Sequence, residues 1–203
     1  MLQLILFSII LSLVHALIPH HWLSLALLSR SEKWTKKQTF QISFVVSFAH
    51  SISTIILGVL IGLIGMEAAH RMGEFTSWFA PLLLILFGII YFSLGQEHHH
   101  SGKTKFKTHS FEKIMLTMAV TLFFSPCLEV ETLYFTAGTF GWEGIFFVSL
   151  IYLVITVCGI TILTLSGKKT IEKLNFHFLE HNEKKIAGMI LILLGIMTYF
   201  VKF

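Results

Sequence analysis

Three histidines lie close together in the apolar segment 2–28. They are His15, His20 and His21, and Pro19 stands among them. Imidazole nitrogen binds nickel, cobalt, zinc, copper and iron, and ionisable side chains inside a membrane span usually mark a functional site. On an unbroken helix His15 and His20 would point about 140° apart, so they converge only if Pro19 distorts the helix. The alternative interpretation is that His20 and His21 mark the end of the span and His15 only packs.

A second apolar segment, 114–137, carries a cysteine and two carboxyl groups after a proline. The residues are Pro126, Cys127, Glu129 and Glu131. A carboxylate at this depth would neutralise a cation or exchange protons as the cation moves, and Cys127 would add a thiolate ligand. The alternatives are that Glu131 lies in water at the external mouth and that Cys127 is a small buried hydrophobic residue.

His50 lies in a third apolar segment, 40–64, among serines and threonines. Such hydroxyl residues let helices approach closely, and they also hold the second nitrogen of a metal-bound imidazole. His50 is therefore either a ligand or a structural histidine. The predicted metal-ligating residues are His15, His20, His21, His50, Cys127, Glu129 and Glu131.

The composition is typical of an integral membrane protein. The chain is 55% hydrophobic and 13% charged, whereas soluble domains carry about a quarter charged residues. We expect an all-α fold with a single transmembrane domain over 1–203, because helices of about 20 apolar residues span a bilayer. The six predicted spans lie near 2–28, 40–64, 79–95, 114–137, 144–166 and 186–202.

Basic residues predict the orientation. All lysines and arginines except Arg71 and Lys202 fall between spans one and two, three and four, or five and six. The positive-inside rule makes that side cytoplasmic and places both termini outside, and we assign the protein to a prokaryotic cytoplasmic (inner) membrane. The histidine tract 98–100 lies on the same side, where it would collect metal ions, which favours efflux.

Three spans in each half would make the second half enter the membrane in the opposite sense from the first. Pro19 and Pro126 then lie at matching positions in spans one and four. Interrupted helices at matching positions of an inverted repeat mark the binding site of many secondary transporters. The sequence therefore predicts a 3+3 inverted repeat with a site near the midplane, between these two spans.

The arrangement His15-x4-His20-His21 resembles the His-x4-Asp-His motif of nickel/cobalt transporters, especially the NicO-like branch of the LysE superfamily of six-helix carriers. The tract 98–100 resembles the histidine-rich cytoplasmic loop of those families. The resemblance implies a small metal carrier with ligands in an early helix. His20 stands where the family has aspartate, which leaves zinc and iron open beside nickel and cobalt.

The predicted function is secondary transport of a divalent transition-metal cation, which is the substrate; we expect no organic cofactor, enzymatic activity or nucleic-acid partner. Binding of the metal to deprotonated ligands would release protons, which would couple metal transport to proton movement. Gly58-x-x-x-Gly62 would pack helices within or between protomers, which leaves a homo-oligomer open. One alternative is a thiol–disulfide electron carrier, since the sequence around Cys127 resembles the CcdA/DsbD type and Cys158 is its one candidate partner. The other is an intramembrane metalloenzyme.

Overall fold

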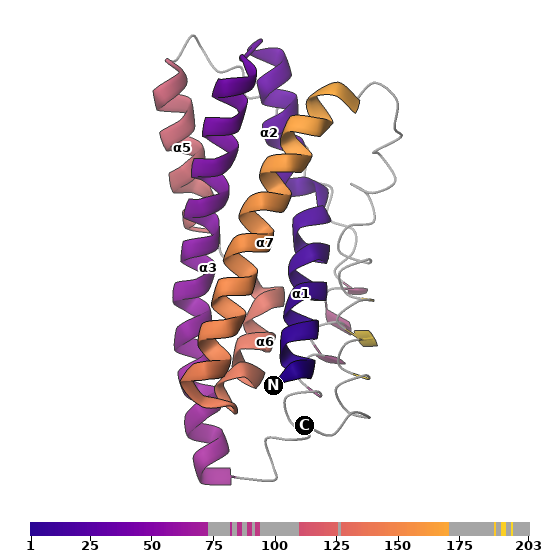
Figure 1. The fold of residues 1–203 in the computed structure, drawn as a ribbon, viewed down its shortest axis with the longest axis vertical. Helices are drawn as coiled ribbons and strands as arrows, with labels where there is room; N and C mark the ends of the chain where they lie inside the picture. The colour runs from indigo at the N-terminus through magenta and orange to yellow at the C-terminus, as the bar shows by residue number, and fades with distance from the viewer. Residues whose placement is uncertain are drawn as a thin grey trace.

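The computed structural model describes residues 1–72, 110–125 and 127–170, with isolated positions between 82 and 93 and between 189 and 196. Within helices, the side chains at 19, 20, 71, 72, 128, 129 and 168–170 lie outside this description. Each element assigned in these ranges is an α-helix, which confirms the all-α prediction for this part of the chain (Figure 1). The helices are α1 (Leu2–Leu17), α2 (Pro19–Ser31), α3 (Lys36–Met72), α5 (Phe111–Phe123), α6 (Leu128–Gly138) and α7 (Gly141–Thr170).

Three helical stretches are long and apolar enough to cross a membrane. They are Leu2–Ser31, Lys36–His70 and Gly141–Gly167, and they coincide with three of the predicted spans. The predicted spans 79–95 and 186–202 lie outside the described residues except for isolated positions. The described chain is thus consistent with a membrane protein, and the total of six spans stays a prediction.

The helix surfaces carry large apolar side chains. Phe40, Phe44 and Phe48 form a stacked row along α3, with neighbouring ring centroids 6.0 and 6.1 Å apart. Each of these side chains is more than 40% exposed in the described chain. Soluble monomers rarely expose continuous apolar surface of this kind, and such a row suits contact with lipid.

Two of the predicted spans are each divided into two helices. α1 and α2 follow one another along the long axis of the molecule, and α5 and α6 do the same in the opposite direction (Figure 1). α3 and α7 run the full length beside them: α3 packs against α5, α6 and α7, while α7 also packs against α1 and α2. The segment 114–137, for which Pro126 predicts an interruption, consists of the two helices α5 and α6.

The apolar core consists of two clusters. The first joins α1, α6 and the start of α7, and the second joins α2, α5, the first half of α3 and the later part of α7. Both helix breaks fall between the clusters, so polar groups at the breaks are enclosed by apolar layers on either side. The first cluster includes Leu4, Leu11, Leu133, Tyr134 and Tyr152, and the second includes Trp22, Leu25, Ile42, Ile114 and Ile160.

Glycines bring α3 and α6 into backbone contact. A Cβ placed on Gly138 would overlap the carbonyl oxygen of Gly62, and one on Gly58 would overlap the ring of Tyr134. Small residues at a helix interface permit this close approach. The Gly58-x-x-x-Gly62 pattern therefore packs helices within the chain.

Candidate metal centre

The break between α1 and α2 is one residue long. Ile18 is extended, with φ −61° and ψ 126°, and Pro19 is the first residue of α2. Because proline has no N–H, it cannot donate to the carbonyl of His15 four residues earlier. The Ile18 N–H donates to that carbonyl instead at 3.2 Å, and Trp22 Nε1 donates to the Leu17 carbonyl at 3.1 Å. The carbonyls of His15 and Leu17 thus have donors, and the predicted distortion at Pro19 is present.

The break between α5 and α6 is wider and frees the carbonyl of Leu122. The residue four positions later is Pro126, which has no N–H to donate. The Ser125 N–H donates to the Leu122 carbonyl at 3.2 Å, and Nδ1 of His50 lies 3.1 Å from the same oxygen. A backbone acceptor released at this break therefore holds an imidazole of α3.

Cys127 is the N-cap residue of α6 and has extended backbone angles, φ −92° and ψ 114°. Its N–H donates to Oγ1 of Thr54 at 3.4 Å, and that hydroxyl donates to the carbonyl of His50 at 3.1 Å. These two hydrogen bonds connect the second break to the turn of α3 that carries His50.

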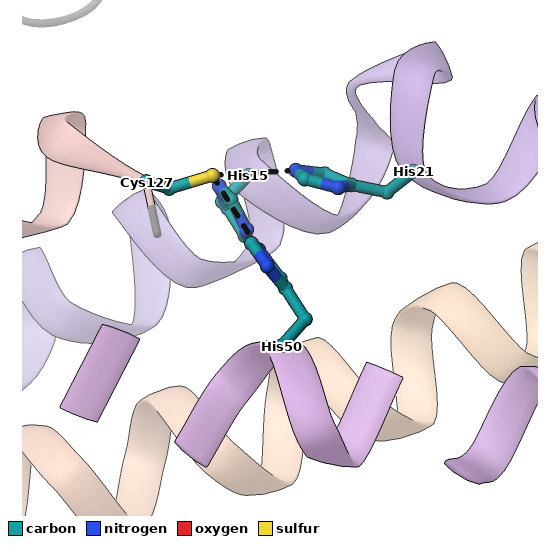
Figure 2. A group of neighbouring side chains, drawn as sticks. All are labelled: His15, His21, His50 and Cys127. Carbon is teal, nitrogen blue, oxygen red and sulfur yellow. Dashed lines mark hydrogen bonds between the residues drawn. The ribbon is translucent and has the colours of Figure 1, made fainter. Parts of the chain in front are cut away.

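Four buried side chains converge where the two breaks meet α3 (Figure 2). His15 comes from the last turn of α1, His21 from the first turn of α2, His50 from the middle of α3, and Cys127 from the second break. One ligand atom from each lies within 4.8 Å of the others. Three imidazoles and one thiol in this arrangement could hold a metal ion.

The distances around Cys127 match those between ligands of a tetrahedral ion. Its Sγ lies 3.5 Å from Nε2 of His21 and 3.4 Å from Nε2 of His50. With metal–sulfur and metal–nitrogen bonds of about 2.3 and 2.0 Å, sulfur and nitrogen atoms at two corners of a tetrahedron lie about 3.5 Å apart. Cys127, His21 and His50 therefore already have spacings that suit a tetrahedral ion.

The hydrogen bonds of two histidines orient their rings. A carbonyl oxygen only accepts, so Nδ1 of His50 must carry the proton donated to Leu122. In the neutral ring Nε2, which faces Cys127, is then the nitrogen with the lone pair that binds metals. The hydroxyl of Tyr152 on α7 is hydrogen-bonded to Nε2 of His15 at 3.2 Å. Such outer contacts hold metal-binding imidazoles in position.

The other predicted ligands are placed differently. The side chains of His20 and Glu129 lie outside the description, so their predicted roles stay predictions. Glu131 is buried on α6, one turn beyond Cys127, but it is not one of the four converging residues. Among the described residues neither of its carboxylate oxygens has a hydrogen-bond partner.

Sequence reasoning missed the residues that orient the ligands. Nothing in the sequence marks Tyr152, because it lies in an ordinary apolar run of α7 and meets His15 only through packing. The carbonyl of Leu122 did carry a signal, since Pro126 four residues later removes its helical donor. Thr54 is one of several hydroxyl residues near His50, and the sequence does not single it out.

Comparison with models of known protein families, with curated proteins and with solved structures finds no match to this chain. The case for function therefore depends on the geometry of the buried group.

Proposed function

We propose that the protein is a secondary transporter of a divalent transition-metal cation of the nickel, cobalt, zinc and iron group. One observation carries the proposal: the buried group of His15, His21, His50 and Cys127 is assembled at two helix breaks inside a protein with membrane-spanning helices. Interrupted helices that meet near the middle of the bilayer form the substrate sites of many secondary transporters.

The directions of the broken helices support a 3+3 inverted repeat. α1 and α2 run opposite to α5 and α6 along the long axis (Figure 1), and each interrupted pair is adjacent to a long helix, α7 for the first and α3 for the second. In such a repeat one half moves against the other around a fixed site. We assign six spans to the chain on this basis, and the distribution of the basic residues favours both termini outside.

The ligands are distributed so that relative movement would change the affinity for metal. Cys127 and the carbonyl that holds His50 both belong to the interrupted pair α5 and α6. A shift of this pair away from α3 would remove one ligand and one orienting hydrogen bond together. His15 and His21 would stay with the other interrupted pair, which provides a way to release the ion.

Glu131 has a separate role in this proposal. A buried carboxyl group without a hydrogen-bond partner is stable only when it is protonated or next to a cation. Its place one turn beyond Cys127 suits a group that neutralises the ion in transit or carries a proton in exchange, and Glu129 is assigned the same role. Efflux is the favoured direction because the histidine tract 98–100 is predicted to be cytoplasmic.

A transport assay tests the proposal. Purified protein in proteoliposomes with a trapped metal-sensitive dye should admit Co²⁺ or Zn²⁺, and His50→Ala should abolish this flux. The matched control is His70→Ala, because His70 is an exposed histidine near the far end of the same helix. Unchanged flux in His50→Ala would show that the site is wrong. Metal binding without flux in any variant would instead indicate a fixed metal centre.

A further inference from the structure

We infer that the buried group selects ions that accept four-coordinate thiolate and imidazole ligation, and that it binds Zn²⁺ in preference to Ni²⁺ and Mn²⁺. As a statement about which ion is transported, this inference rests on the proposed function. It concerns the binding step alone, which can be measured without transport.

The types of ligand favour Zn²⁺ over Ni²⁺ and Mn²⁺. The four converging residues offer three nitrogen atoms and one sulfur atom, and no carboxylate belongs to the group among the described residues. Sulfur with nitrogen in a tetrahedral set is typical of zinc, whereas manganese prefers six oxygen ligands and nickel(II) prefers planar or tetragonal nitrogen and oxygen sites.

The distances between the ligand atoms also favour tetrahedral coordination. Cys127 Sγ is 3.5 and 3.4 Å from the two facing imidazole nitrogens, and both distances lie near the tetrahedral value of about 3.5 Å. Bonds of the same lengths at the right angle of a planar site would put sulfur and nitrogen about 3.0 Å apart. The contacts of Cys127 with His21 and His50 are closer to the tetrahedral distance than to this planar one.

The hydrogen bonds around the ligands limit how far the ligands can move to accept another coordination geometry. His50 is held by the carbonyl of Leu122 at 3.1 Å and His15 by the hydroxyl of Tyr152 at 3.2 Å. The N–H of Cys127 is held by Thr54. A site whose ligands come from four different segments, with three of the four restrained by these contacts, cannot easily open to accept two more ligands.

Cobalt(II) is a suitable probe because its absorption spectrum distinguishes tetrahedral from octahedral coordination and shows a sulfur-to-metal band when a thiolate is bound. Purified protein should give the intense tetrahedral spectrum with the thiolate band at one Co²⁺ per chain. Zn²⁺ should displace the Co²⁺ at near-equal concentration. Ni²⁺ and Mn²⁺ should need an excess of at least about 100-fold, a larger discrimination than loss of one outer-shell contact produces.

Two variants and one control make the test specific to Cys127. Cys127→Ser should lose the thiolate band and weaken Co²⁺ binding, while Cys127→His should lose the band and keep the tetrahedral spectrum. Cys158→Ser is the matched control, since Cys158 is exposed on α7 and does not belong to the group; it should leave the spectrum unchanged. Retention of the tetrahedral spectrum in Cys127→His also shows that a variant at this position folds.

The outcomes distinguish the inference about ion selectivity from the proposal that the protein transports metal. An octahedral Co²⁺ spectrum, a thiolate band that survives in Cys127→Ser, or displacement by equal Ni²⁺ would overturn the inference even if metal flux is observed. A tetrahedral thiolate spectrum displaced by Zn²⁺, without flux in proteoliposomes, would uphold the inference and reject transport.

Discussion

The two helix breaks perform different tasks at the same site. The break between α1 and α2 is one residue long and has a ligand on each side, His15 before it and His21 after it. The break between α5 and α6 is longer, and it supplies one ligand, Cys127, and one backbone acceptor for His50. The first break therefore sets a ligand–ligand distance, and the second adds a softer donor and orients a ligand that belongs to α3.

Helix geometry shows why this difference matters. On an unbroken helix, His15 and His21 would be about 9 Å apart along the axis and about 120° apart around it. Their ring centroids are 4.7 Å apart, so the break allows the two rings to meet. The position of Cys127 instead depends on how α6 packs against α3.

The largest loss of affinity for metal is expected when both ligands of the first break are removed. His15→Ala combined with His21→Ala leaves two of the four ligands, which is too few to hold an ion against water, and Co²⁺ binding should become undetectable by titration. Cys127→Ala should retain weak binding because three imidazoles remain. If Cys127→Ala binds Co²⁺ more weakly than the double variant, the first break does not contribute more to metal binding than the second.

Pro19→Ala should have the next largest effect. Alanine restores an N–H that can donate to the carbonyl of His15, so α1 and α2 can join into one helix and separate the two imidazoles. We expect the affinity for Co²⁺ to fall by more than the roughly 100-fold that loss of an outer contact costs. Helix content by circular dichroism should rise slightly or stay constant, and unchanged affinity would mean that packing alone maintains the break.

Pro126→Ala should have a smaller effect. The new N–H can compete with His50 for the carbonyl of Leu122, which loosens the ring of His50 without removing a ligand. Loss of such a contact typically lowers metal affinity by about 10–100-fold. The measurement is the same Co²⁺ titration, and an effect equal to that of Pro19→Ala would show that the two breaks contribute in the same way.

Tyr152→Phe should have the smallest effect, because it removes only the hydroxyl that orients His15. We expect a loss of affinity of roughly tenfold, at the lower end of outer-shell effects. Tyr134→Phe is the matched control: both tyrosines are fully buried, but the Tyr134 hydroxyl donates to Ser149 instead of a ligand. If both variants lose affinity equally, the effect comes from packing and the contact with His15 is not responsible.

The sequence by itself determined the class of protein and the places where its helices break. Long apolar segments can satisfy their backbone groups in a membrane only as helices, and proline cannot donate to the residue four positions earlier. The all-helical fold and the break at Pro19 were therefore predictable, as were His15, His21, His50 and Cys127 as candidates.

Only the tertiary structure decided which candidates meet. Spacing along a helix fixes the angle between two side chains but not the packing of separate helices, and Cys127 and His21 are 106 residues apart in the chain. Packing brings the thiol to two imidazoles, leaves Glu131 outside the group, and places Tyr152 and the Leu122 carbonyl behind the ligands. These contacts join residues from different helices, and their distances depend on how the apolar surfaces of those helices fit together.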